Sequence, residues 1–373
     1  MSLRRRIGAL LPARLRSRIV RGLAQLQQER GGWGERRRLA QVRRRIERDV
    51  REGRFGRPYV VASPPDVRQW MRDVDANYRE FANPFEYYAR FVEALDRIGN
   101  QEIVPVRSLL GEAAAGLRRV ALRHDIDADP VTAVRAARHL ARVGVPGSFY
   151  LLHTAPYYGR LEGGVFVRSP DVREWLRSLI VSGCEVGVHN DALSLLLDHG
   201  VDGVGALRAE IEWMRSEGAR VHGTVGHNSA VVYGAENSEI FVGRKLWDRP
   251  TPLLPLESLD EAEMGLHYEG GFMRRRPDVD VERARAFVAD RAAADVRSER
   301  WMRTLLLDNP CHDWAVDFQF WLVGQDQWVV GGRKGDFEVF ESCVAAKRVL
   351  ELLADLPGDA RSLVVLHPEY VRH

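Results

Sequence analysis

The sequence has few cysteines and no long apolar run. Three cysteines in 373 residues are too few for a disulfide framework, which favours a reducing compartment. No stretch reaches the roughly 18 apolar residues that a membrane-spanning helix needs. The apolar run that follows Arg4, Arg5 and Arg6 breaks at Pro12, which is not typical of a secretory signal. We therefore expect a cytoplasmic protein.

Internal repeats and low-complexity segments are also lacking after the first 57 residues. Hydrophobic residues make up 45% of the chain and charged residues 29%, which is typical of globular proteins. The length allows one large α/β domain with a smaller appendage. The net charge of +3 is unevenly spread, because residues 1–57 carry about +13 and the remainder about −10.

Residues 1–57 are predicted to form a basic, amphipathic helical extension. Their apolar residues recur at steps of three and four, with arginines between them: Ile7, Leu10, Leu11, Leu15, Ile19, Leu23 and Leu26. Such a helix could lie on an anionic membrane surface or pack as a solvated tail on the rest of the protein. We expect no nucleic acid partner, because aromatic residues are not interleaved and no recognition motif is present.

The rest of the chain divides into a lead-in segment, residues 58–117, and an α/β region, residues 118–373. The lead-in contains short extended pieces at 59–61 and 103–106 and a helix at 84–98. Beyond it, the patterns predict strands at 120–122, 147–152, 185–189, 221–225, 317–322, 328–330 and 363–366. Helices are predicted between them at 130–143, 171–181, 204–217 and 342–353. Strands that alternate with helices over such a length predict a parallel sheet, and the length fits closure into a barrel.

Ionisable residues follow four of the predicted strands. They are Asp125 and Asp127, His189, His227 and His367. In a parallel barrel, the carboxyl ends of all strands open on one face, and barrel enzymes carry their active sites there. These residues, although far apart in the sequence, are therefore expected to converge.

Asp125 and Asp127 are two residues apart at the end of a strand, so their side chains point the same way. Two carboxylates held this close favour a bound cation. An alternative is that Asp127 or Asp129 caps the helix that begins at Pro130. His189 and Asp191 have the same spacing, and an imidazole with a carboxylate suits zinc or a similar divalent metal.

Four segments in this order resemble the polysaccharide deacetylase superfamily (carbohydrate esterase family four). They are residues 122–127 (Leu-Arg-His-Asp-Ile-Asp), 144–150 (Gly-Val-Pro-Gly-Ser-Phe-Tyr), 185–189 (Glu-Val-Gly-Val-His) and 366–368 (Leu-His-Pro). The first is most similar to the branch whose motif is Arg-His-Asp-hydrophobic-Asp. The resemblance covers about residues 84–373. It implies a distorted (β/α)7 barrel, one divalent metal such as zinc, and hydrolysis of N-acetyl groups on sugars.

The resemblance also implies roles for individual residues. Asp125 matches the catalytic base, Asp127 and His189 match metal ligands, and His367 matches a late histidine that acts as general acid. The family's second metal histidine should follow His189 by four residues, but that position is Leu193. We expect His227 to be the third ligand, because small residues flank it. The alternatives are Asp191, then His222 and His199.

The expected substrate-binding residues are polar residues close to these positions or in loops of suitable composition. Arg123 adjoins Asp125, and it could, like His124, instead tune that carboxylate. Residues 233–237 follow His227 and contain Glu236 and Asn237. Residues 307–314 mix acidic, amide and aromatic side chains, as sugar sites often do, and contain Asp308. The expected set is Arg123, Asp191, Glu236, Asn237 and Asp308.

The sequence thus predicts a hydrolase that removes an acyl group, N-acetyl in the first instance, from a sugar or an activated sugar. A step of surface-polysaccharide synthesis on the inner side of the membrane fits the missing secretion signal and the basic extension. Two other hypotheses stay open. Leu193 favours a catalytically inactive relative that binds sugar or acts as a scaffold, and residues 1–57 favour an adaptor that binds a membrane or nucleic acid.

Overall fold

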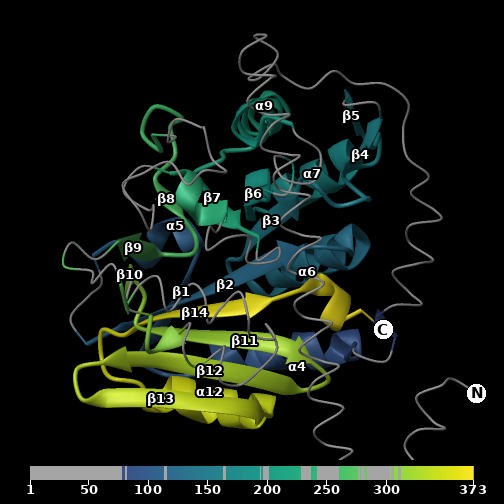
Figure 1. The fold of residues 1–373 in the computed structure, drawn as a ribbon. Helices are drawn as coiled ribbons and strands as arrows, with labels where there is room; N and C mark the ends of the chain where they lie inside the picture. Colours follow the sequence, from purple (N-terminus) through teal and green to yellow (C-terminus); the bar gives the residue numbers. More distant parts are fainter. Residues whose placement is uncertain are drawn as a thin grey trace, which may run out of the picture. The chain divides into compact units, whose positions relative to one another are not determined.

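The computed structural model (Figure 1) describes residues 78–79, 82–112, 116–162, 165–193, 195, 201–227, 237–241, 260–275, 278, 282–283, 303, 306–309 and 312–372. The basic extension, the strand predicted at 59–61, His199 and Glu236 lie outside these residues, so those predictions stay predictions. None of the described helices is long and apolar enough to cross a membrane.

The described residues form a mixed α/β structure around a ten-stranded sheet. The strand order is β13 (Phe337–Val344), β12 (Gln327–Lys334), β11 (Phe318–Gly324), β14 (Arg361–Leu366), β2 (Arg118–Ile126), β3 (Ser148–Leu152), β6 (Glu185–Asn190), β7 (Gly223–Gly226) and β8 (Tyr268–Glu269). Every pairing from β11 to β8 is parallel. β1 (Gln101–Val104) pairs in parallel with the first half of β2.

Along the sequence, helices alternate with the parallel strands, as predicted. They are α6 (Pro130–Val143), α7 (Val172–Val181) and α9 (Gly203–Ser216), with α4 (Phe85–Asp96) and α5 (Val106–Leu109) in the lead-in and α12 (Ala346–Asp355) before β14. The predicted bounds of α6 are confirmed at both ends. Asp129 Oδ1 accepts the N–H of Thr132 at 3.0 Å, Pro130 opens the first turn, and Gly144 ends the helix at φ 75°. Asp129, not Asp127, is therefore the cap.

Antiparallel elements were not predicted from the sequence. β13 pairs antiparallel with β12, and β12 with β11. The helix predicted at 342–353 begins only at Ala346, because residues 342–344 belong to β13. Two small antiparallel pairs were also missed, the hairpin of β4 (Gly159–Glu162) with β5 (Val165–Arg168) and the pairing of β9 (Met273–Arg275) with β10 (His312–Trp314).

The sheet is curled, but a closed barrel is not confirmed. Among the described residues, no strand pairing joins β8 to β11 or to β13. Tyr268 of β8 nevertheless shares one buried cluster with Tyr150 of β3 and Leu363 of β14. The N–H of Ala315, shortly before β11, also donates to the carbonyl oxygen of Phe272 at 2.7 Å, shortly after β8. These contacts bring the region after β8 towards the region before β11.

The antiparallel strands are covered by helices on one face. The Phe91 ring of α4 stacks on Trp328 of β12, with 4.8 Å between ring centroids, and α12 also packs on β12. The described part of the lead-in is thus joined to the sheet through β1 and through α4 (Figure 1).

One buried ion pair joins the hairpin β4–β5 to α9. Glu210 is fully buried, and its carboxylate accepts hydrogen bonds from Arg168 at 2.7 Å and from the Tyr158 hydroxyl at 2.5 Å. We expect Arg168→Ala to lower the free energy of unfolding by about 3–5 kcal/mol, because it leaves a buried carboxylate without its cation. Chemical denaturation measures this loss.

Arg177→Ala is the matched control. Arg177 pairs with Glu217 at 3.1 Å but is 61% exposed, so its loss should lower the free energy of unfolding by under about 1 kcal/mol. An equal effect of the two substitutions would show that the buried pair is not needed for stability.

Candidate metal centre

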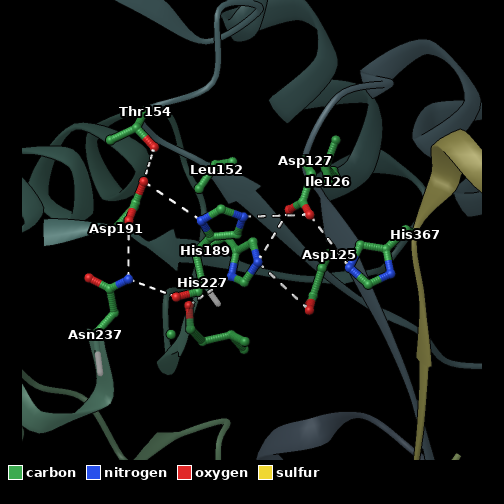
Figure 2. A network of polar contacts seen from close by, with 12 residues as sticks. Asp125, Ile126, Asp127, Leu152, Thr154, His189, Asp191, His227, Asn237 and His367 are labelled. Carbon is green, nitrogen blue, oxygen red and sulfur yellow. Dashed lines mark hydrogen bonds and ion pairs between the residues drawn. The ribbon is translucent and has the colours of Figure 1, made fainter. Parts of the chain in front are cut away.

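Three ligand-type side chains, at the carboxyl ends of β2, β6 and β7, converge as Figure 2 shows. His189 Nε2 lies 3.3 Å from Asp127 Oδ1, and His227 Nε2 lies 3.7 Å from Asp127 Oδ2. The three ligand atoms lie within 4.8 Å of one another. Ligands bound to zinc at about 2.0–2.2 Å in a tetrahedron are separated by roughly 3.4 Å. A small inward movement would therefore let this group hold a metal ion.

His189 is positioned by the neighbouring strand. β6 is buried along its whole length, and His189 Nδ1 lies 2.8 Å from the carbonyl oxygen of Val225 in β7. A carbonyl can only accept, so Nδ1 carries the hydrogen. Nε2 then faces Asp127 and is the ring nitrogen left for a metal ion, and this is the arrangement by which metal-binding histidines are usually oriented.

His227 directly follows β7, and its N–H donates to the carbonyl oxygen of Asn190 at 2.7 Å. Its ring lies between two carboxylates, with Nδ1 3.6 Å from Asp191 Oδ2 and Nε2 facing Asp127. Burial lowers the pKa of His227, but Asp127 and Asp191 outweigh burial and raise it from 6.5 to about 10. The ring is therefore protonated at neutral pH in the metal-free protein.

Asp127 is ionised despite its surroundings. Burial raises its pKa, but the contacts with His189, His227 and His367 hold that pKa well below its usual range. Its Oδ1 is buried, and no described residue donates a hydrogen bond to it. An unpartnered carboxylate oxygen beside two imidazoles fits the donor set of a divalent ion.

Asp125 is held by Arg123, which was predicted to bind substrate. Arg123 Nε donates to Asp125 Oδ1 at 2.8 Å, Nη2 donates to Oδ2, and Nη1 donates to the carbonyl oxygen of Gly270. This guanidinium is buried and paired with Asp125, and contact of Arg123 with a substrate stays a prediction. Burial raises the pKa of Asp125, but Arg123 outweighs burial and lowers it.

His367 follows β14 and lies on the other side of Asp127, with Nε2 3.5 Å from Asp127 Oδ2 (Figure 2). Burial lowers the pKa of His367 despite the nearby carboxylates of Asp127 and Asp125. The ring is therefore neutral in the metal-free protein, whereas the sequence prediction had it as an imidazolium. His124 points into the core instead, where it stacks on Phe149 at 4.2 Å.

Asp191 and Asn237 were predicted to bind substrate, and for both residues contact with a substrate stays a prediction. Asp191 is 5% exposed and Asn237 2% exposed. Asn237 Nδ2 donates to Asp191 Oδ1 at 3.1 Å. Both side chains thus face the protein around His227 and leave little surface for a substrate.

Sequence reasoning missed His153, which follows β3. Its Nε2 accepts the N–H of Asp191 at 2.8 Å. Burial lowers the pKa of His153 to about 4, so the neutral ring is available as an acceptor. The signal that identified His189 and His227, an imidazole just past a parallel strand, applies equally to His153.

The other candidate ligands lie elsewhere. Leu193 is buried, and its N–H donates to Asn237 Oδ1 at 2.9 Å. His222 precedes β7 and so lies at the opposite end of that strand from His227.

The structure does not bring Asp308 to the centre either, because its segment lines a cavity of about 390 Å³ with Asp317. The N–H of Arg361, at the start of β14, donates to Asp317 at 2.7 Å. This cavity therefore lies near the amino end of β14, whereas His367 follows its carboxyl end.

Comparisons of the chain with models of protein families, with curated proteins and with solved structures found no match.

The raised pKa of His227 predicts how the stability of the metal-free protein depends on pH. The folded protein keeps a proton on His227 up to about pH 10, whereas the unfolded chain loses it near pH 6.5. The stability contributed by His227 should be complete below pH 6.5 and decline as pH rises to 10. Denaturation of wild type and His227→Ala in chelator at pH 6, 8 and 10 measures the difference.

The groups that face the His227 ring are Asp127, His189, Asp191 and His153. The pKa of Asp127 is held well below its usual range and burial lowers that of His153 to about 4, so these two groups titrate below this window. A difference between the two proteins that stayed constant from pH 6 to pH 10 would contradict the raised pKa.

Proposed function

We propose that this chain is a metal-dependent hydrolase that removes an acyl group, N-acetyl in the first instance, from a sugar or an activated sugar. One observation carries the proposal. Asp127, His189 and His227 converge at the carboxyl ends of parallel strands, with Asp125 and His367 beside them. This is the face on which parallel barrels carry their active sites. We also infer that the curled sheet is the described part of a distorted (β/α)7 barrel.

The proposed metal is zinc. Two imidazoles and one carboxylate are a donor set that zinc takes in catalytic sites, where three protein ligands leave a position for water or substrate. When bound, the ion would polarise the acyl carbonyl and lower the pKa of a water molecule. The unpartnered Oδ1 of Asp127 and the Nε2 atoms of His189 and His227 are the ligand atoms in this proposal.

Asp125 is the proposed general base. It stays ionised at neutral pH because Arg123 holds it through two hydrogen bonds. Arg123 also makes the carboxylate a weak base, so Asp125 can take a proton only from a water that is already acidified. The guanidinium fixes which way the carboxylate faces, and Arg123 is thereby a positioning residue.

His367 is the proposed general acid. It reaches the centre from β14, and 23% of its side chain is exposed, so a substrate can contact it. An amine is a poor leaving group and needs a positioned proton donor. Since the ring is neutral in the metal-free protein, His367 would first gain a proton and then donate it to the leaving nitrogen.

The proposed setting is the synthesis of a surface polysaccharide at the inner face of a membrane. The arginine-rich residues 1–57 support this setting, since basic amphipathic helices bind anionic membrane surfaces. A substrate attached to a nucleotide or a lipid fits such a location.

Metal content and acetate release test this function together. Purified wild type should hold about one zinc ion per chain and release acetate from a member of a panel of N-acetylated nucleotide sugars. Asp127→Ala and His227→Ala should lose both the zinc and the activity. Asp125→Asn should keep the zinc and lose activity by about 100-fold or more, because only the proton acceptor is removed.

Arg177→Ala, at an exposed position, is the control for both measurements. No zinc in wild type after reconstitution would refute the hydrolase proposal and favour the inactive, sugar-binding alternative. Zinc with no acetate release from any member of the panel would refute the proposed substrate class.

A further inference from the structure

We propose that Asp191 and Asn237 are positioning residues that hold His227 as the third metal ligand. This inference rests on the proposed function, because it assigns these residues to the metal centre. We name the pair the His227 clamp. It assigns a specific task at the centre to two buried polar side chains.

The carboxylate of Asp191 is fixed from several directions (Figure 2). Its Oδ2 accepts the hydroxyl of Thr154 at 2.7 Å, and its Oδ1 accepts Nδ2 of Asn237 at 3.1 Å. Its backbone N–H donates to His153 Nε2 at 2.8 Å. Residues from the ends of β3 and β6 and from the short 3₁₀ helix Asn237–Ile240 thus immobilise one carboxylate.

Asn237 connects this carboxylate to the backbone on which His227 sits. Its Nδ2 also donates to the carbonyl oxygen of His227 at 2.7 Å, and its Oδ1 accepts the N–H of Leu193 at 2.9 Å. Its own carbonyl oxygen accepts Nδ2 of Asn190 at 2.8 Å. A single amide therefore fixes the start of the segment after β7 relative to the end of β6.

The orientation of His227 follows from the contacts of its two ring nitrogens. Asp191 Oδ2 lies 3.6 Å from Nδ1, and Asp127 Oδ2 lies 3.7 Å from Nε2. With its hydrogen on Nδ1 towards Asp191, the ring presents the lone pair of Nε2 to the ion. Carboxylate, imidazole and metal in this order are a recurring arrangement in metal sites. His189 has a backbone carbonyl in the corresponding place.

Leu193 explains why a clamp is needed here. Its position, four residues after His189, cannot supply a ligand, and its N–H is instead bonded to Asn237. The third ligand in this proposal directly follows β7, and His227 is not itself part of a helix. We infer that Asp191 acts through His227 and not as a ligand itself, because both of its oxygens already accept hydrogen bonds.

A double-mutant cycle on zinc affinity tests the clamp. Zinc dissociation constants are measured by competition with a chromophoric chelator for wild type, Asp191→Asn, His227→Ala and the double variant. Asp191→Asn should weaken zinc binding by about 10–100-fold, which is typical for loss of a group that orients a ligand. In the His227→Ala background the same substitution should change the dissociation constant less than about threefold, since its target is gone.

Asn237→Ala should weaken zinc binding in the same direction and should also lose its effect in the His227→Ala background. Glu210→Gln is the matched control, because it also converts a buried carboxylate to an amide but on α9, among Arg168 and Tyr158. It should lower stability and leave the zinc dissociation constant unchanged.

The outcomes separate this inference from the proposed function. Absence of zinc binding in wild type overturns both. Zinc binding that His227→Ala weakens and Asp191→Asn does not overturns the clamp alone. An equal effect of Asp191→Asn with and without His227 also overturns it, because Asp191 would then bind the ion directly or act on the whole centre.

Discussion

The candidate metal centre depends on one partly buried charge, the carboxylate of Asp127. Imidazoles from the ends of β6, β7 and β14 lie 3.3, 3.7 and 3.5 Å from its oxygens. A carboxylate in such a place is unfavourable unless hydrogen bonds or cations compensate for the lost water. The strands β6, β7 and β14 must therefore end where their histidines can contact the carboxylate of Asp127, so that it remains ionised. The same condition that stabilises this anion also assembles a donor set for a divalent metal.

The candidate metal ligands could be predicted from the sequence, because each strand end is a local signal and the parallel topology brings the strand ends together. Each strand that ends on an ionisable residue is recognisable by itself, and parallel pairing brings such ends to one face. This reasoning identified His227 although the spacing of the resembled family pointed to position 193. The same reasoning did not reveal that Arg123, Asp191 and Asn237 take part in buried polar pairs. A polar residue type does not reveal whether its side chain meets a substrate or another buried polar group, because that pairing is set by tertiary contacts.

The fold shows the same division between features set by local sequence signals and features set by long-range contacts. The bounds of α6 were predicted because Asp129, Pro130 and Gly144 are local signals that act within one turn. β13 was missed because its burial alternates only weakly and its pairing with β12 is a long-range choice. Closure of the sheet is also a long-range feature. It depends on how β8 lies relative to the start of β11, and no local sequence pattern encodes that arrangement.

A candidate third ligand that follows β7 changes what the proposed metal centre depends on. A histidine one helical turn after His189 would be held by local helix geometry alone. His227 is instead placed by the pairing of His189 with Val225 and of Asn190 with Gly226. A shift of one residue in this register would turn His227 to the opposite face, because side chains alternate along a strand. The clamp formed by Asp191 and Asn237 spans this same edge. Metal affinity and the integrity of the β6–β7 edge are therefore coupled, and a bound ion would stabilise that edge by the same free energy by which the edge strengthens its binding.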